Sequence, residues 1–349
     1  MPTITLCTFN VENLFGRYKV FGFLPGDKYK RKILSKEELQ ERGGFLPGHV
    51  FAPKNSFEIF DNKEWRGLTA QALKGKTEDY PDIACLQEVE SMQVLRLFNE
   101  KYLAKNKKPV YPYVLLIDSH DPRLIDIGVL SKHRIVDLKN HMDEPYDDKS
   151  GYLFSRDCLE VTFEIAGKSL TLFINHLKSK FTEQKDKKGD EERKKANEKR
   201  KAQAVRVAEI VRTRFGENNF SSKAFAVVGD FNDTPDSEYV KPLAKDLGLE
   251  NVISSRITDK KEQWTHWWEG KNIVSQIDYI LLSPRLANDS KKDPYIERKG
   301  ISTARKKSHL AGPGDTQGEE FSFDFLRFTG VTDKIAASDH CPVFMELEL

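Results

Sequence analysis

The sequence predicts a mixed α/β (α+β) fold with a large core. Short apolar runs, each long enough for one strand, alternate along the chain with polar, turn-rich or helical stretches. Many of these runs are continuously apolar, a pattern typical of strands that are covered on both faces. Hydrophobic residues make up 38% and aromatic residues 11% of the 349 residues, which argues against disorder even though 32% are charged.

The apolar runs and the helical periodicities place the elements along the chain. The apolar runs predict strands, in chain order, at 3–10, 83–87, 113–117, 128–131, 158–165, 168–176, 224–229, 277–282 and 341–347. Helices are predicted over 64–78, 92–102 and 191–215. One side of the last helix carries the apolar residues Ala204, Val207, Ala208, Ile210 and Val211.

Three segments interrupt this order. Residues 16–63 are rich in Gly, Pro and charge, residues 182–201 form a dense run of mixed charge, and residues 288–332 carry basic residues followed by Gly-Pro-Gly. No break in composition divides the chain into two self-sufficient halves. We therefore expect long loops or extended helix tips at these places rather than linkers between domains.

The composition excludes several classes of protein. The 56 basic and 54 acidic side chains leave a net charge of +2, which argues against a polycation of the histone type. No apolar run approaches the roughly 18 residues that a membrane helix needs. The cysteines are far apart and lack a CxxC spacing, so we expect buried reduced thiols rather than disulfides or a zinc site. They are Cys7, Cys85, Cys158 and Cys341.

The N-terminus has the pattern of a strand and lacks the basic and apolar regions of a signal peptide. A cytoplasmic protein is therefore expected if the chain is complete, and a secreted protein is expected if a signal was removed.

Acidic, amide and imidazole side chains recur where the apolar strands end. A carboxylate beside an apolar run is costly to bury unless it is paired or bound to a cation. One such residue is more often a cap or a turn residue, but a series of them at strand ends indicates an assembled site. The motifs are FNVENLF at 9–15, LQEVE at 86–90, INHLKSK at 174–180, GDFNDTP at 229–235, QIDYILLS at 276–283 and SDHCPV at 338–343.

The chemistry that these side chains suit is phosphoester hydrolysis. Oxygen donors without a thiolate favour Mg²⁺ over zinc, with Mn²⁺ as a possible substitute. Hydrolysis of a phosphodiester requires neutralisation of its charge, activation of a water molecule and stabilisation of the leaving oxygen. Carboxylates can hold the metal, Asn and His can donate to phosphate oxygens, and a carboxylate or an Asp–His pair can accept the proton of water.

On these motifs the chain resembles the endonuclease/exonuclease/phosphatase superfamily. This group contains DNase I-like nucleases, abasic-site endonucleases, sphingomyelinases and inositol polyphosphate phosphatases. The six motifs stand in the family's order and span nearly the whole chain, and HLKSK resembles the bacterial nuclease-like members. The resemblance implies a DNase I-like four-layer sandwich, in which two packed mixed β-sheets are flanked by helices and the site lies at one end.

The resemblance also bears on domain organisation. Motifs that run from residue 9 to residue 343 have to meet at one site. We therefore expect a single endonuclease/exonuclease/phosphatase domain over 1–349, enlarged by the insertions near 16–63, 182–201 and 288–332.

The resemblance implies a set of metal ligands. Glu88 matches the principal metal-binding glutamate of the family, and Asn10 matches its first-strand asparagine near the metal. Asp339 resembles a carboxylate on the metal side. Glu12 takes the place of an acidic residue that some members use as an additional contact. The implied cofactor is Mg²⁺, or Mn²⁺ in its place.

Five further residues match catalytic positions of the family. Asp230 matches the aspartate that activates water, and Asn232 matches the amide that orients the phosphate. Asp278 matches the aspartate that orients the last histidine, and His340 resembles that histidine, which stabilises charge on the phosphate. His176 stands where DNase I-like members have a histidine that contacts the scissile phosphate or protonates the leaving group. Abasic-site endonucleases use other residues there, so His176 argues against that branch.

For several other residues the sequence leaves two interpretations open. Arg156 stands where an arginine often points at the site, and a surface salt bridge is equally consistent. Lys178 can contact a phosphate or be solvated. The aromatic stretch 264–268 can stack on bases or pack in the core. Asp233 is expected to be a turn residue. Surface or loop positions are expected for His49, His120, His133, His141, His266 and His309.

The expected function is a metal-dependent phosphodiesterase, a nuclease that cuts DNA or RNA by in-line attack of an activated water. One alternative is a phosphatase or phospholipase of the same superfamily, acting on inositol phosphates, sphingomyelin or another small phosphate ester. Another is an inactive relative that binds nucleic acid. The expected partner is nucleic acid as substrate, with no stable protein partner and a monomeric state. The basic clusters at 28–32 and 305–307 are expected on the substrate face.

Overall fold

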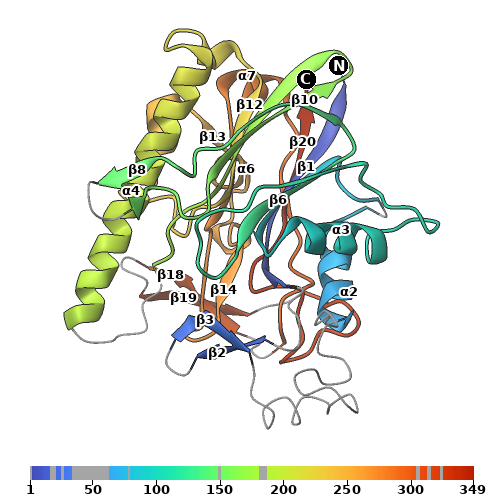
Figure 1. Cartoon of the computed structure of the whole chain (residues 1–349), viewed down its shortest axis with the longest axis vertical. Coiled ribbons are helices and arrows are strands. Elements are labelled where there is room, and N and C mark those ends of the chain that lie inside the picture. The colour runs from blue at the N-terminus through green and yellow to red at the C-terminus, as the bar shows by residue number, and fades with distance from the viewer. Residues whose placement is uncertain are drawn as a thin grey trace.

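Two packed β-sheets form the centre of the molecule in the computed structural model (Figure 1). The structure describes residues 2–15, 21–24, 27–33, 63–77, 79–147, 151–180, 187–303, 307–312, 316–322 and 325–349. The strands of the first sheet are, in spatial order, β17 (Tyr295–Ile296), β20 (Val343–Glu348), β1 (Thr3–Leu14), β4 (Ile83–Val89), β6 (Asp126–Ser131) and β5 (Tyr113–Leu116). The second contains β13 (Glu250–Asn251), β16 (Asp278–Leu282), β12 (Phe225–Asp230), β11 (Lys168–His176), β10 (Cys158–Ile165) and β7 (Arg134–Lys139).

Smaller elements complete the described part of the chain. A third sheet contains β14 (His266–Trp268), β15 (Ile273–Ser275), β18 (Lys307–Ala311) and β19 (Gln317–Ser322). Two short pairs are β2 (Phe21–Leu24) with β3 (Asp27–Ile33), and β8 (Pro145–Asp147) with β9 (Gly151–Tyr152). The α-helices are α2 (Lys63–Ala72), α3 (Met92–Lys101), α4 (Lys187–Phe215), α5 (Lys241–Leu247), α6 (Val252–Arg256) and α7 (Pro284–Asp289), and the 3₁₀ helices are η1 (Phe220–Ser222) and η2 (Lys260–Glu262).

The molecule has four layers because both faces of each large sheet are covered. In β1, Ile4 and Leu6 face the core between the sheets, whereas Cys7 and Phe9 face the outer core that α2 and α3 cover. Helices α4 and α5 cover the outer face of the second sheet. Burial on both faces explains why these strands are continuously apolar in sequence. The predicted four-layer α/β sandwich is confirmed.

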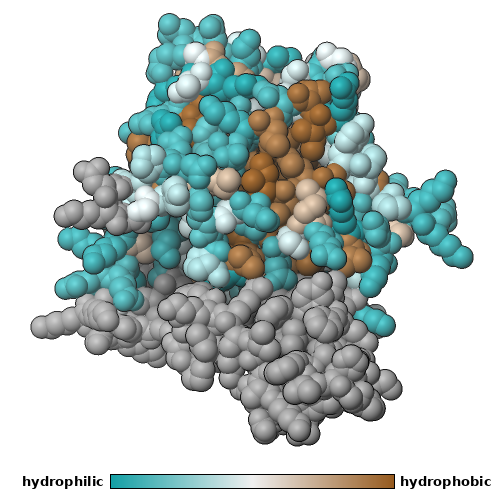
Figure 2. Space-filling model, viewed as in Figure 1, coloured by the Kyte–Doolittle hydropathy of each residue, from teal (hydrophilic) through white to brown (hydrophobic). Residues whose placement is uncertain are grey.

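The nine predicted strands and the three predicted helices are present, with boundaries shifted by a few residues. All four cysteines are buried and free, as expected. In Figure 2 apolar side chains gather over the strands around β6 and β10, and polar side chains cover much of the rest of this face. Among the helices in the described part of the chain, none is both long enough and apolar enough to cross a bilayer.

The three predicted insertions differ in what the structure describes of them. Most of 16–63 lies outside the described residues, apart from the backbone of β2 and β3. From Lys187 onward, 182–201 belongs to α4. Residues 288–332 are not a plain loop, because β17 extends the first sheet and β18 and β19 build the third. The expectation of one domain over 1–349 stays a prediction.

The expected position of the basic clusters also stays a prediction. The side chains of 28–32 lie outside the described residues, as do residues 305 and 306. Lys307 is described at the start of β18, where its Nζ lies 3.1 Å from Glu320 Oε1.

Candidate active site

Strand ends from both large sheets meet at one edge of the sandwich. β1 is parallel to β4 and β11 is parallel to β12, so each pair brings its carboxyl ends together. β16 and β20 are antiparallel to β12 and β1, so both begin at that edge. The six sequence motifs therefore converge, and a hydrogen bond of 3.0 Å from Asn10 Nδ2 to Asp230 Oδ2 joins the sheets there.

Asp230 is the buried centre of this arrangement. Its side chain is 1% exposed at the end of β12. Oδ2 accepts hydrogen bonds from Asn10 Nδ2 at 3.0 Å and Asn232 Nδ2 at 3.1 Å, while Oδ1 accepts from the Asn232 backbone N at 2.8 Å. Burial raises the pKa of Asp230 to about 6, although the positive charge of His340 opposes this. A carboxylate with this pKa can accept a proton near neutral pH.

His176 lies beside Asp230 because β11 and β12 pair closely. The register places His176 opposite Asp230 and Asn175 opposite Gly229. Gly229 has a φ of +128°, and a Cβ there would lie 1.9 Å from the carbonyl oxygen of Asn175, so only glycine fits. His176 Nε2 lies 3.4 Å from Asp230 Oδ2. Burial and then the charge of Arg156 lower the pKa of His176 well below its usual range, so its ring is neutral at pH 7.

His340 is the charged counterpart of the neutral His176. Its Nδ1 lies 2.9 Å from Asp278 Oδ2, and the Asp278 backbone N in turn donates to Thr265 Oγ1 at 3.0 Å. Burial alone would lower the pKa of His340, but the carboxylates of Asp278 and Asp230 outweigh it and raise the pKa well above its usual value. Nε2 lies 3.9 Å from Asp230 Oδ2, so the positively charged ring faces the site.

Three more carboxylates line the open side of the site. The Asp339 backbone N donates to Glu12 Oε2 at 3.0 Å, and the Asn13 backbone N donates to Glu88 Oε2 at 3.1 Å. Glu88 Oε1 lies 4.0 Å from His176 Nε2. Glu12, Asn13 and Glu88 have φ values of +46°, +62° and +68°. Such backbone is unfavourable for the two glutamates, whereas asparagine adopts it more readily, and it falls near the ends of β1 and β4 that reach the site.

The donor chemistry of these residues fits a hard divalent cation. The Glu12 side chain is partly open to solvent, although protein packs around its carboxylate. The pKa of Glu12 is raised to about 8, first by desolvation and then by repulsion from Asp339 and Glu88. Crowded oxygen donors of this kind suit Mg²⁺ or Mn²⁺. Asn10 Oδ1 accepts a hydrogen bond from the Glu12 backbone N at 3.1 Å, so the Asn10 amide lies next to these carboxylates.

His266 is a site residue that sequence reasoning missed. In the described part of the chain, His266, Asp339 and His340 form one of two groups with three ligand atoms within 4.8 Å of one another. The other group is Asp230, Asp278 and His340, in which Asp278 is hydrogen-bonded to His340. His266 forms a β-bridge with His340, and its Nε2 lies 3.7 Å from Asp339 Oδ2.

The expectation of a surface or loop position for His266 was therefore wrong. This histidine comes from a three-residue strand that forms only through tertiary pairing, so the sequence holds no periodic signal for it. The Asp339 side chain is partly exposed, and the protein packed around it would raise its pKa, but hydrogen bonding to His266 and the charge of His340 lower this pKa to about 2. Asp339 thus stays ionised beside the two histidines.

Arg156 and Lys178 carry positive charges near His176, and these charges contribute to its lowered pKa. Arg156 is not in a surface salt bridge, because the pair it forms with Asp121 is buried, with Nε 2.9 Å from Oδ2. Its Nη1 donates to the carbonyl oxygen of Leu177 at 2.9 Å. Burial and then the charge of Arg156 lower the pKa of Lys178 to about 8. The phosphate-binding roles of both residues stay predictions.

A hollow of about 260 Å³ opens beside the carboxylates of Glu12 and Asp339. Trp65, Trp267 and Trp268 are among its lining residues. Within the aromatic stretch, Trp264 and Trp267 are 3% and 2% exposed and pack in the core, whereas Trp268 is half-buried with Lys271 Nζ 4.4 Å from its ring. The stretch therefore contributes to both the core and the wall of this hollow.

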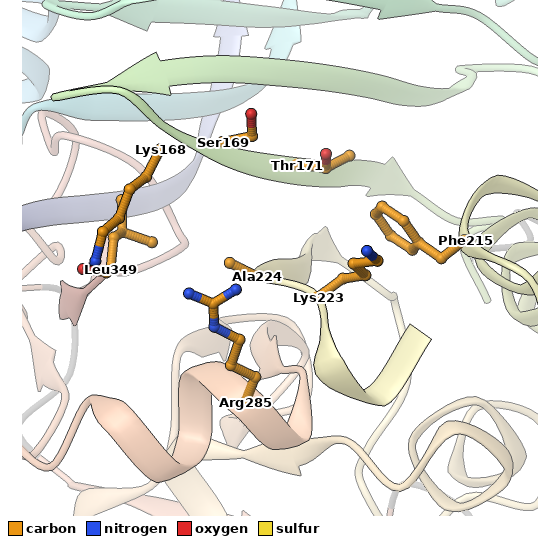
Figure 3. Close-up of a pocket in the computed structure, with 8 residues that line it drawn as sticks. All are labelled: Lys168, Ser169, Thr171, Phe215, Lys223, Ala224, Arg285 and Leu349. Atoms are coloured by element: carbon orange, nitrogen blue, oxygen red, sulfur yellow. Dashed lines mark hydrogen bonds between the residues drawn. The ribbon is translucent and has the colours of Figure 1, made fainter. Parts of the chain in front are cut away.

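A second hollow, of about 280 Å³, lies away from the site (Figure 3). Lys168 and Ser169, at the start of β11, line it together with Ala224, directly before β12. Because His176 and Asp230 stand at the far ends of these two strands, this hollow is at the opposite edge of the sheet. It takes no part in the arrangement around Asp230.

Comparisons with known proteins identify the family and the fold of the chain. Residues 63–349 match the family model described as "Endonuclease/Exonuclease/phosphatase family". A comparison with curated proteins gives no match.

Several solved structures have a similar fold. Truncated TDP2 of Caenorhabditis elegans is 14% identical, with a TM-score of 0.54 over 99% of this chain and 98% of that one. The endonuclease/exonuclease/phosphatase of Bacteroides vulgatus is 14% identical, with a TM-score of 0.53 over 100% of both chains. The human Nocturnin catalytic domain, with a bound sulfate anion, is 16% identical, with a TM-score of 0.51 over 100% of this chain and 95% of that one.

Proposed function

The chain belongs to the endonuclease/exonuclease/phosphatase family, and on this premise we propose that it is a Mg²⁺-dependent phosphodiesterase whose substrate is DNA or RNA. The observation that carries the proposal is the surroundings of Asp230. One buried carboxylate with a pKa of about 6 accepts hydrogen bonds from Asn10 and Asn232 and lies between a neutral and a charged histidine. This arrangement provides a base for water and donors for the phosphate at one place.

The residues that would hold the metal in this proposal are Glu88, Asn10, Asp339 and Glu12. When bound, a divalent cation neutralises charge on the phosphate oxygens and polarises the phosphorus–oxygen bond. Oxygen donors fit Mg²⁺, and Mn²⁺ can replace it. His266 stands at the edge of this group through its contact with Asp339.

The protein's own residues divide the remaining work. Asp230 orients water and accepts its proton, while the Asn232 amide orients the phosphate. The charged His340 ring, held by Asp278 through Nδ1, donates through Nε2 to a phosphate oxygen on which negative charge develops. Because the pKa of His176 is lowered, this histidine is neutral, which favours contact with the phosphate over donation of a proton to the leaving group.

A substrate panel tests the proposal. Plasmid DNA, single-stranded RNA, bis-p-nitrophenyl phosphate and inositol phosphates are incubated with the protein in Mg²⁺, in Mn²⁺ and in EDTA. We expect cleavage of a nucleic acid and of bis-p-nitrophenyl phosphate in either metal, and no cleavage in EDTA. Turnover of inositol phosphates alone would favour the phosphatase alternative. Salt-dependent DNA binding without turnover would favour the inactive relative.

Glu88→Gln is expected to weaken the binding of Mg²⁺. The change keeps the shape of the side chain but removes its charge, so the Mg²⁺ concentration that gives half-maximal rate should rise by at least about 10–100-fold. The measurement is a Mg²⁺ titration of the hydrolysis rate. Glu100→Gln, at an exposed position on α3, is the matched control and should leave the titration unchanged. Superimposable titrations for wild type and Glu88→Gln would exclude Glu88 as a metal ligand.

A further inference from the structure

Helix α4 contributes two fully buried polar side chains to the loops that carry the candidate site. Arg200 is 0% exposed and Gln203 is 1% exposed. Both stand in a helix whose first half is densely charged, and neither belongs to any of the six motifs. A buried guanidinium is costly unless all its donors are paired, so its partners show what it holds in place.

The first loop held by α4 is the one that follows His176. The Lys178 backbone N donates to Gln203 Oε1 at 2.8 Å, and Arg200 Nη1 donates to the Lys178 carbonyl oxygen at 2.6 Å. Both backbone groups of Lys178 are therefore bound to α4. Gln203 is itself fixed, because its Nε2 donates to the Leu153 carbonyl oxygen at 2.8 Å.

The second loop held by α4 follows Asp230. Arg200 Nε and Nη2 lie 3.0 Å and 2.9 Å from Asp233 Oδ2, and Asp233 is 1% exposed. The Asp233 carbonyl oxygen accepts from the Tyr279 hydroxyl at 2.6 Å. Asp233 directly follows Asn232, whose φ of +54° lies in the left-handed region that asparagine can adopt, so a firmly held neighbour helps to fix this turn.

The two loops also meet at the site itself. Asn232 Nδ2 donates both to Asp230 Oδ2 and to the Leu177 carbonyl oxygen, each at 3.1 Å. The orientation of the Asn232 amide thus depends on where Leu177 and Asp233 lie. Arg200 contacts the neighbours of both residues with one guanidinium group.

We propose that Arg200, supported by Gln203, is a positioning residue that fixes the Asn232 amide and His176 beside Asp230. The inference rests on the proposed function, since it concerns the geometry of that same site. Arg200 does not touch the reacting atoms. It acts through Lys178 and Asp233, and a displacement of the donors by about 1 Å can lower a rate by about 100-fold.

The test compares Arg200→Met with Arg206→Met. Arg206 also lies on α4, and its Nε is 2.7 Å from Glu144 Oε2, so its removal also costs the helix an ion pair but frees neither loop. We expect Arg200→Met to lower kcat by about 10–100-fold with little change in KM, because the substrate contacts remain while the donors shift. Arg206→Met should stay within about twofold of wild type. Rates are measured well below the thermal midpoint of each variant.

Two further readouts separate positioning from plain stability. Arg200→Lys keeps a charge near Asp233 but lacks the planar fork, so its kcat should lie between those of wild type and Arg200→Met. Amide hydrogen exchange should speed up at 177–180 and 231–235 in Arg200→Met and not in Arg206→Met. Equal kcat values for the two Met variants, or unchanged exchange in both loops, would overturn the inference.

The exchange measurement does not depend on activity. If the wild-type protein cleaves no phosphoester, the proposed function fails. Unchanged amide hydrogen exchange at 177–180 and 231–235 in Arg200→Met would contradict only the positioning role of Arg200.

Discussion

Asp230→Asn is expected to lower the rate of phosphoester hydrolysis by about 10²–10⁴-fold, the contribution typical of a well-placed general base. The amide has nearly the shape of the carboxylate but cannot accept a proton from water. Asp230 is almost fully buried and accepts hydrogen bonds from Asn10 and Asn232. The amide oxygen can keep the bonds from the Asn10 and Asn232 side chains, while its NH2 group loses the bond from the Asn232 backbone N. The fold should therefore persist at some cost in stability while the chemistry is lost.

The measurement is kcat for bis-p-nitrophenyl phosphate in saturating Mg²⁺, with circular dichroism and a thermal melt to confirm folding. Asp236→Asn is the matched control, because this aspartate is exposed on the same loop, and it should retain the wild-type rate. A folded Asp230→Asn protein with more than a tenth of the wild-type kcat would rule out Asp230 as the base.

His340→Ala is expected to lower kcat by about 10²–10³-fold, the cost typical of removing one preorganised donor to a developing negative charge. The Asp278 and Asp230 carboxylates keep this buried ring charged, and its Nε2 faces the site. Asp278→Asn leaves the ring in place but removes the carboxylate that orients it, so a comparable loss is expected. Comparable losses in both variants would indicate that the pair works as a unit.

His133→Ala is the control for this experiment. His133 follows β6, which is antiparallel to β4, so it lies at the end of the first sheet away from the site. Its removal should leave kcat within about twofold of wild type. Equal rates for His340→Ala and His133→Ala would contradict the role of His340, whereas a wild-type rate for Asp278→Asn alone would limit the contradiction to the orienting carboxylate.

The central strands could be predicted because a strand that is buried on both faces is a continuous run of apolar residues. The elements that were missed lack this signal. β7 is an edge strand with largely exposed residues, and β13, β14 and β17 are two or three residues long. Such short strands form because a neighbour pairs with them, and that neighbour is distant in the chain. Helices α5, α6 and α7 are likewise too short to show a period.

The candidate site divides in the same way. Its central residues stand in motifs at strand ends. Because β1 is parallel to β4 and β11 is parallel to β12, these strand ends meet at one place. Arg200 and His266 could not be predicted from the sequence. Arg200 stands in a run of charged residues, where nothing distinguishes it, and His266 lies in a strand of three residues. Asp233 was expected to be a turn residue, and its Oδ1 does accept from the Thr234 backbone N at 3.0 Å. Its buried ion pair with Arg200 spans 33 residues and has no local signature.

The most direct test of the account is one assay of bis-p-nitrophenyl phosphate hydrolysis, run with wild type and Asp230→Asn side by side in Mg²⁺ and in EDTA. The account predicts hydrolysis by the wild type in Mg²⁺, restored when Mg²⁺ is added back after EDTA. It predicts a rate at least about 100-fold lower for Asp230→Asn in Mg²⁺, and no hydrolysis above background by either protein in EDTA. Hydrolysis by the wild type that persists in EDTA, or equal rates for the two proteins in Mg²⁺, would contradict it.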